Sequence, residues 1–372
     1  MKRQYILRGA GCLSALDNMV KQYGMTRPLL VCDASFDLPE VKSNFSAVTA
    51  GMARYSDISP NPRYEDILAG VKVYKDLRCD GILTVGGGSV MDTAKCIKLF
   101  SVMPENVDYL TQIPHDATAP LIAVPTTAGT GSESTRYAVI YCNGEKQTVT
   151  HLSIIPDCVF LDALTLRTLP AYQKKSALLD ALCQGVESMW AVGSTQESTG
   201  YARDAVASIM RYADEYLNIP FQTECAQAIL EASNLAGMAI NITQTTAAHA
   251  LCYKLTTLFG LAHGHAVAVV LPKLWRYMLC HTNDCIDIRG EAYLRGVFND
   301  IALHMGCQNA SDAIIRLEHL LAEQDMHTPR LTEDHVDKLT QAVNLERLKN
   351  TPVTLGASAI ASIYAKIGGA RS

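Results

Sequence analysis

The chain has 372 residues, of which 48% are hydrophobic and 19% charged, and its formal net charge is −5. This length exceeds what one ordinary core serves, so two domains are expected. The charges form no basic run, which argues against nucleic acid or an anionic membrane as a partner.

Targeting and membrane signals are absent from the sequence pattern. No run of 18 uninterrupted apolar residues occurs, so a spanning helix is not expected. The early positive charges are not followed by the apolar core of a secretory signal. Twelve cysteines are scattered singly without a CxxC pair, which is typical of reduced thiols in a cytoplasmic protein.

The first part of the chain alternates short apolar runs with amphipathic stretches. Strands are expected at 28–33, 81–89, 120–127 and 158–166, and helices at 64–77 and 91–100. Strand–helix alternation predicts a parallel sheet with helices on both faces. We therefore expect a Rossmann-like α/β dinucleotide-binding domain over residues 1–166.

Beyond residue 166 the pattern changes to long segments with a 3.6-residue period. Residues 201–217 and 224–240 are examples, rich in Ala, Leu, Gln and Glu. Strand signals nearly vanish, so residues 167–372 are expected to form an all-helical domain. This domain would bind the metal and the substrate, and the ligands are expected in the cleft between the two domains.

A glycine turn, Gly86 to Ser89, follows the predicted strand at 81–86 and precedes a helix. Glycines let the backbone approach a pyrophosphate, and a helix start offers free N–H groups and a positive dipole end. A plain tight turn is the alternative, but its placement between strand and helix favours the nucleotide. The loop at 125–134 also follows a strand and is dense in Gly, Thr and Ser, as in loops that fold around a phosphate, ribose or carboxamide.

Asp33 ends the first predicted strand of this domain. A carboxylate at that position can accept hydrogen bonds from the adenosine ribose. A helix cap or turn residue is an equally good interpretation.

A second group of polar residues lies in apolar surroundings in the helical half. Asp180 and Gln184 are spaced i, i+4 and so face the same way on a helix. His249 and His263 stand in a stretch of small and apolar residues. A lone histidine there is usually a satisfied core residue, but two of them with an aspartate favour a metal site.

The two histidines can share a metal only if the chain turns back between them. In one continuous helix they would lie about 21 Å apart. Gly260 and Gly264 offer the necessary break. An Asp-His-His set suits Zn²⁺ or Fe²⁺ and leaves a position for a substrate oxygen.

Four segments together resemble the signatures of the iron-containing alcohol dehydrogenases. They are residues 86–95, 125–133, 180–188 and 249–264, which follow one another in the family's order. The resemblance implies an NAD(P)-dependent oxidoreductase with a dehydroquinate synthase-like architecture, an α/β domain followed by a helical one. It also implies one divalent metal and a homodimer.

The resemblance assigns roles by position. The pyrophosphate would be held by Gly87, Gly88 and Ser89, with Asp92 nearby, and the ribose and nicotinamide would be lined by Thr126, Thr127 and Thr130. Lys146 would reach a ribose hydroxyl. Asp33 would favour NAD over NADP by repelling a 2′-phosphate.

The metal ligands implied are Asp180, His249 and His263, with Gln184 as a possible fourth. Two positions depart from the family pattern, because Gln184 and Tyr253 each stand where a histidine is usual. Zinc in place of iron thereby becomes plausible. Tyr253 is the candidate catalytic residue, relaying a proton to the alkoxide, although simple packing is an equal alternative.

Within the family, residues 180–198 and 244–268 most resemble the phosphonoacetaldehyde reductases. Those enzymes reduce phosphonoacetaldehyde to 2-hydroxyethylphosphonate, so the substrate pocket would need a cation. Lys254, Arg136 and Arg63 are candidates, each with a surface ion pair as the alternative role.

Three other functions stay open at this point. The nearest is another small-aldehyde or diol dehydrogenase of the same family, with an uncharged pocket. A second is a sugar-phosphate cyclase of the dehydroquinate synthase type, a lyase without net NADH turnover. A third is a metal-free binding protein that has lost catalysis.

Overall fold

A computed structural model describes residues 4–105, 107–218 and 220–367. The chain divides into two compact units. The sheet unit comprises residues 4–169 with 220–237, and the helical unit comprises residues 170–218 with 238–367. The boundary between the units thus falls after residue 169, whereas the sequence predicted it after residue 166. Segment 220–237 belongs to the sheet unit, although the sequence analysis assigned it to the helical domain.

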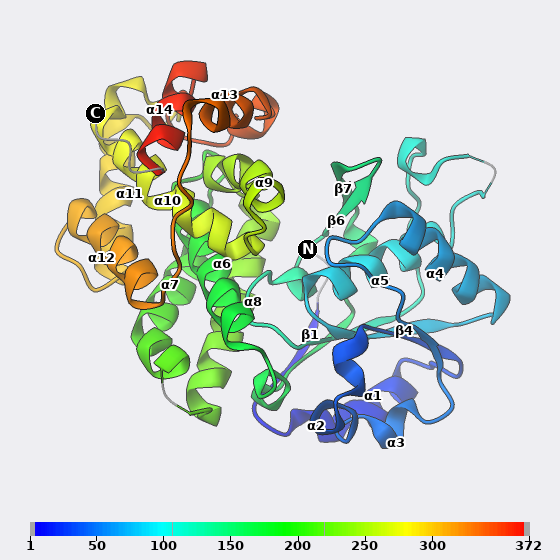
Figure 1. Cartoon of the computed structure of the whole chain (residues 1–372). Coiled ribbons are helices and arrows are strands. Elements are labelled where there is room, and N and C mark those ends of the chain that lie inside the picture. The colour runs from blue at the N-terminus through cyan, green and yellow to red at the C-terminus, as the bar shows by residue number, and fades with distance from the viewer. Residues whose placement is uncertain (1–3, 106, 219, 368–372) are drawn as a thin grey trace. The chain divides into compact units, whose positions relative to one another are not determined.

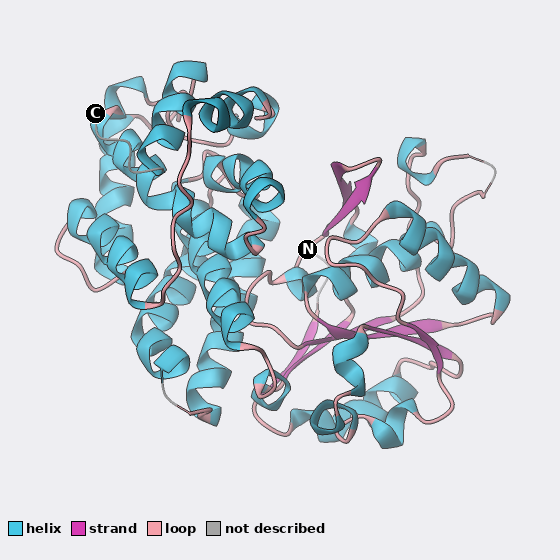
Figure 2. Ribbon diagram, viewed as in Figure 1, coloured by secondary structure: helices cyan, strands magenta, loops and turns pink. Residues whose placement is uncertain are grey.

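The sheet unit is built on six parallel strands in the order β1-β8-β5-β4-β2-β3 (Figure 2). The strands are β1 Tyr5–Arg8, β2 Pro28–Cys32, β3 Ala53–Tyr55, β4 Gly81–Gly86, β5 Leu121–Pro125 and β8 Cys158–Leu161. The predicted parallel sheet is confirmed. Its four longest apolar runs were recognisable because a strand buried on both faces is apolar throughout.

Helices cover both faces of this sheet (Figure 1). In β2, Leu29 and Val31 pack into one cluster with α4 and α5, whereas Leu30 and Cys32 pack into the other with α1 and α2. This alternation follows from the two-residue period of a strand. The helices are α1 Leu16–Gln22, α2 Pro39–Lys42, α3 Ser46–Thr49, α4 Tyr64–Asp76 and α5 Gly88–Phe100.

A separate antiparallel hairpin, β6 Tyr137–Cys142 with β7 Glu145–Thr150, was not predicted. Asn143 and Gly144 form its turn with φ values of 51° and 78°. Two consecutive positive φ angles are what a two-residue hairpin turn requires, and Asn-Gly is its strongest sequence signal. The turn was therefore recognisable in the sequence, but the polar residues of β7 gave no strand signal.

The helical unit is built of helices, as predicted (Figure 2). The long helices after the sheet strands are α6 Ala171–Trp190, α7 Gln196–Asn218, α8 Thr223–Thr243, α9 Ala247–Phe259, α10 His263–Cys280, α11 Glu291–His304, α12 Ala310–Glu323, α13 Glu333–Gln341 and α14 Ala357–Ile367. Trp190, Trp275 and Phe298 meet in its core, with ring centres 5.6 to 6.1 Å apart.

None of the helices in the described ranges has the length and apolarity needed to cross a membrane. All twelve cysteines lie in these ranges, and none of them forms a disulfide. Cys280, the last residue of α10, is the only exposed one.

Candidate active site

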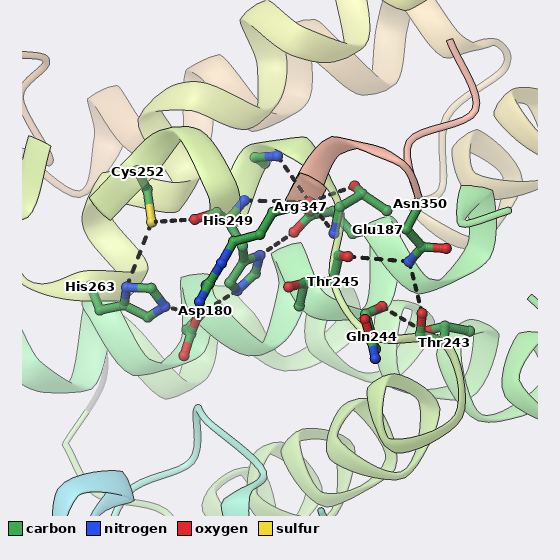
Figure 3. A network of polar contacts seen from close by, with 12 residues as sticks. Asp180, Glu187, Thr243, Gln244, Thr245, His249, Cys252, His263, Arg347 and Asn350 are labelled. Carbon is green, nitrogen blue, oxygen red and sulfur yellow. Dashed lines mark hydrogen bonds and ion pairs between the residues drawn. The ribbon is translucent and has the colours of Figure 1, made fainter. Parts of the chain in front are cut away.

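Three side chains from three helices of the helical unit converge on one point (Figure 3). Asp180 comes from the middle of α6, His249 from the first turn of α9 and His263 from the first position of α10. Asp180 Oδ1 lies 3.3 Å from His249 Nε2 and 3.9 Å from His263 Nε2. We call these three residues the ligand cluster, since each offers one ligand atom and these atoms lie within 4.8 Å of one another.

The chain break expected between the two histidines is present. Helix α9 ends at Phe259, and Gly260 follows with φ 65°, a left-handed conformation that glycine adopts without strain. Helix α10 then begins at His263, and the two imidazole centres lie 5.4 Å apart. A methyl group at Gly264 would overlap the Ser176 carbonyl oxygen on α6. Glycine there lets α10 begin close against α6, beside Asp180.

Glu187 orients His249. Its buried carboxylate accepts the Thr246 N–H at 3.1 Å and the Ala248 N–H at 3.0 Å, at the start of α9. Its other oxygen contacts His249 Nδ1. A proton on Nδ1 donated to Glu187 leaves Nε2 with its lone pair toward Asp180, which is how carboxylates orient metal-binding histidines.

The donor set fits a divalent metal. Two imidazole nitrogens and a carboxylate oxygen suit Fe²⁺ or Zn²⁺. Bonds of about 2.1 Å in a tetrahedron separate ligand atoms by about 3.4 Å, close to the two distances from Asp180. Burial lowers the pKa of His249, but the charges of Glu187 and Asp180 outweigh this and raise it to about 9. Gln184, buried one turn after Asp180, lies on the same face of α6.

A second group of residues borders His263. Cys252 Sγ lies 3.6 Å from His263 Nδ1. The Tyr253 ring is parallel to the His263 ring, with centres 6.1 Å apart. Arg347 donates an N–H to the Tyr253 hydroxyl at 3.1 Å. Burial raises the pKa of Tyr253, so the hydroxyl keeps its proton at neutral pH.

The three cationic side chains predicted as phosphonate ligands are Arg63, Arg136 and Lys254, and each is either bonded to a neighbouring side chain or exposed. Arg63 pairs with Asp66 at 2.7 Å, and Arg136 donates to the Tyr137 hydroxyl at 3.0 Å. Both belong to the sheet unit. Lys254 is exposed on α9. The ion-pair role considered for Arg63 is therefore the observed one.

The glycine turn and the threonine-rich loop lie side by side. The turn follows β4 and the loop follows β5, and neighbouring parallel strands end at the same edge of a sheet. A Cβ at Gly88 would lie 2.7 Å from Thr130 Cγ2, and one at Gly87 would lie 3.2 Å from Thr127 Cγ2. Glycine is therefore needed for the close approach of turn and loop. The carboxyl edge of such a sheet, with the start of α5, is where dinucleotides bind.

The Asp92 carboxylate accepts hydrogen bonds from this loop and from β6. Its Oδ1 accepts from Ser132 Oγ at 2.6 Å and its Oδ2 from the Val139 N–H at 2.9 Å. Buried Lys95 donates to Ser132 Oγ, Thr135 Oγ1 and the Tyr137 carbonyl at 2.8 to 3.0 Å. Burial lowers the pKa of Lys95 to about 8. Both side chains shape the loop, a role that the sequence did not indicate.

Other predicted nucleotide residues lie at the ends of β4 and β5 and on the separate hairpin. Ser89 is the second residue of α5. Thr126 follows β5 and donates its N–H to the Gly86 carbonyl at 3.1 Å. Lys146 is half-buried on β7, opposite Tyr141.

Asp33 follows β2 and caps the short 3-10 helix Ala34–Asp37. One carboxylate oxygen, Oδ1, accepts both the N–H and the hydroxyl of Ser35. This is the capping role considered from the sequence. It is compatible with ribose recognition, because the bonds to Ser35 use one of the two oxygens.

Sequence reasoning gave no role to Glu187, Cys252 or Arg347. Glu187 was detectable, because it follows Asp180 by seven residues and so lies two turns along the same helix face. Arg347 was not, since it lies in a polar stretch 94 residues after Tyr253.

Comparison with known proteins agrees with this architecture. Residues 4–163 match the iron-containing alcohol dehydrogenase family, and residues 175–367 match the C-terminal domain of the Fe-containing alcohol dehydrogenase family. The two matches together cover most of the chain.

Individual relatives belong to the same group. A phosphonoacetaldehyde reductase of Streptomyces viridochromogenes is 32% identical over 77% of this chain and 76% of its own length. A probable alcohol dehydrogenase, EutG, of Escherichia coli is 27% identical over 96% of this chain and 92% of its own. A crystal structure of sulfoacetaldehyde reductase from Bifidobacterium kashiwanohense, in complex with NAD⁺, has the same fold, with a TM-score of 0.89 and 23% identity over 100% of this chain and 98% of that one. The chain is therefore an oxidoreductase of the iron-containing alcohol dehydrogenase family.

Proposed function

We propose that this protein reduces a small aldehyde carrying an anionic group, phosphonoacetaldehyde, to its alcohol, 2-hydroxyethylphosphonate, with NADH. The observation that carries the proposal is the ligand cluster of Asp180, His249 and His263, which suits carbonyl reduction. The substrate is taken from the relative that is 32% identical, the phosphonoacetaldehyde reductase.

The ligand cluster would hold one Fe²⁺ or Zn²⁺ ion, with Gln184 as a possible weak fourth ligand. A metal bound there supplies Lewis acidity, which polarises a carbonyl and stabilises developing alkoxide charge. Glu187 keeps His249 in the tautomer that presents Nε2. The buried setting of Asp180 and His249 excludes water from that side of the site.

The sheet unit would bind the nucleotide. NADH supplies the hydride. Gly87, Gly88 and Ser89 would hold the pyrophosphate through the backbone, and the threonine-rich loop would line the ribose and nicotinamide through Thr126, Thr127 and Thr130. Lys146 would reach a ribose hydroxyl, and Asp33 would favour NADH over NADPH through its carboxylate charge.

Tyr253 is the candidate for delivering a proton to the product. Its hydroxyl accepts an N–H from Arg347, so its own hydrogen is a donor toward another acceptor. Its ring is stacked beside His263, next to the ligand cluster. Protein assembly as a homodimer and a cytoplasmic location complete the proposal.

A panel of aldehydes tests this function. Phosphonoacetaldehyde, propionaldehyde and lactaldehyde are assayed by NADH and NADPH oxidation, with the metal content measured in the same samples. We expect the highest kcat/KM for phosphonoacetaldehyde with NADH and about one metal ion per chain. Equal kcat/KM for propionaldehyde would point to the alternative of another small-aldehyde or diol dehydrogenase of the same family. Product formation without net NADH oxidation would indicate the lyase alternative.

A further inference from the structure

Arg347 is held over an aromatic ring at the edge of the ligand cluster. Its guanidinium carbon lies 5.2 Å from the centre of the Tyr253 ring, and one of its N–H groups bonds to the Tyr253 hydroxyl. Figure 3 draws Arg347 in the same network of polar contacts as Asp180, His249 and His263. The Tyr253 ring centre also lies 6.1 Å from the His263 ring centre, so Arg347 and His263 both border the same tyrosine ring.

The backbone that carries Arg347 is fixed. Arg347 lies in the short 3-10 helix Leu345–Leu348, whose Leu348 is buried. Two residues later, Asn350 donates to the Thr243 and Thr245 carbonyls and accepts the Gly193 N–H. These bonds fasten the segment next to the start of α9. The guanidinium is therefore placed in advance, which reduces the entropy lost on binding.

The Arg347 guanidinium uses one of its N–H donors on the Tyr253 hydroxyl and forms no ion pair with the described residues. Within residues 4–105, 107–218 and 220–367, no carboxylate lies within ion-pair distance of its guanidinium, although the side chain is half-buried. Other arginines of the helical unit do pair with carboxylates. They are Arg203, Arg276, Arg289, Arg295 and Arg316.

We propose that the Arg347 guanidinium, fixed on Tyr253, binds the tetrahedral oxyanion group of the substrate, a phosphonate or sulfonate, while the aldehyde end lies at the ligand cluster. This inference rests on the proposed function and names the residue that selects the substrate class. A guanidinium presents planar, paired N–H donors that match two oxygens of such a group.

Lys254 is the competing candidate, but its position is less suitable. It follows Tyr253 on α9 and is therefore rotated by about 100° around the helix from the ring that borders His263. Its ammonium is exposed, so binding there would bring the substrate anion to solvent. A charge in water gains little from pairing compared with one held against a ring and a buried cluster.

The experiment compares Arg347→Met with Lys254→Met and Arg211→Met in the metal-loaded protein. Arg211 is the matched control, since its guanidinium also stacks on a tyrosine, 5.4 Å from the Tyr212 ring centre, on the surface of α7. Phosphonoacetaldehyde, sulfoacetaldehyde and propionaldehyde serve as substrates. For Arg347→Met we expect kcat/KM to fall at least tenfold more for both anionic aldehydes than for propionaldehyde, with the extra loss mainly in KM. Loss of the bond to the Tyr253 hydroxyl should lower kcat for all three aldehydes alike.

Further variants separate the anion contact from folding. Arg347→Lys should recover part of the loss, because it restores the charge without the forked donors. Arg211→Met and Lys254→Met should leave all three kcat/KM values within about twofold. A selective loss in Lys254→Met with none in Arg347→Met would overturn the assignment. A loss in Arg347→Met that is equal for propionaldehyde would make the residue structural and would overturn it as well.

A binding measurement gives a readout apart from turnover. Calorimetric titration with ethylphosphonate should show binding to wild type and at least tenfold weaker binding to Arg347→Met, whereas equal affinities would contradict the proposal. If the wild type prefers phosphonoacetaldehyde and Arg347→Met keeps that preference, the Arg347 assignment is wrong but the proposed function stands. Wild type without any preference for anionic aldehydes defeats the proposed function itself.

Discussion

The two candidate binding regions of this protein are assembled in different ways. In the sheet unit, the Gly86–Ser89 turn and the 125–134 loop are continuous segments that follow adjacent strands, and glycines let them touch. In the helical unit, the ligand cluster is made of single side chains from α6, α9 and α10. The first region depends on backbone shape and the second on side-chain orientation.

This difference decides which substitutions matter in each region. A site made of backbone is damaged by adding atoms, because a new Cβ meets a neighbouring segment. A site made of side chains is damaged by removing atoms, including those that only orient a ligand. The predictions below test this contrast, from the largest expected effect to the smallest.

Removing a histidine of the ligand cluster should have the largest effect. His249→Ala and His263→Ala should each lose the bound metal and lower kcat/KM by on the order of 10³-fold, since each removes one of three strong ligands. Metal analysis and NADH oxidation measure both effects. Gln184→Ala is the control and should lose much less, because a neutral amide is a weak ligand. Full activity after complete chelation of wild type would refute the metal site.

Adding one methyl group at Gly131 should be the largest effect in the sheet unit. Gly131 has φ 59°, and a Cβ there would lie 2.5 Å from Gly237 Cα. Gly131→Ala should cost about 3 kcal/mol of stability from backbone strain and overpacking, and should weaken NADH binding. Gly144→Ala is the matched control, with φ 78° and open space around it, and should cost about 1 kcal/mol. Equal shifts in thermal unfolding would show that the close approach is unimportant.

Glu187→Gln tests the orienting carboxylate. Loss of its charge should weaken metal binding by about 10- to 100-fold, as for other residues that hold a ligand histidine. Competition with a coloured chelator measures this affinity directly. Glu133→Gln is the matched change in the sheet unit, where a buried carboxylate accepts from Asn234 at 3.0 Å. It should leave metal affinity unchanged, and an equal loss in both variants would refute the role of Glu187.

Asp33→Gly should have the smallest effect. Removing the carboxylate should lower the preference for NADH over NADPH by about tenfold, because a 2′-phosphate is no longer repelled. Ratios of kcat/KM for the two cofactors measure it. Ser35→Ala removes the hydrogen-bond partner of Asp33 but keeps its charge, so the preference should persist. A wild type that already prefers NADPH would contradict the assignment.

The sequence predicted those features that depend on local pattern. The strands Pro28–Cys32, Gly81–Gly86 and Leu121–Pro125 are buried along their whole length and almost entirely apolar. The glycine break between His249 and His263 is encoded within a few residues. The orienting role of Glu187 and the position of Arg347 were not predicted, because each depends on packing between segments distant along the chain. Segment 220–237 was placed in the wrong unit for a related reason, since helical periodicity does not show which core a helix joins.

The exposed thiol at the end of α10 makes the helical unit accessible to magnetic resonance. Cys280 closes the 18-residue helix that His263 opens, so a nitroxide attached there lies about 25 Å from the ligand cluster, at 1.5 Å per residue. Cys183 and Cys252, which lie on the helices that carry Asp180 and His249, are buried and react more slowly with a spin-labelling reagent. Fe²⁺ is paramagnetic and Zn²⁺ is diamagnetic, so the relaxation rate of the Cys280 label distinguishes the two metals once the partly buried thiols are replaced. These are Cys12, Cys79, Cys142, Cys285 and Cys307.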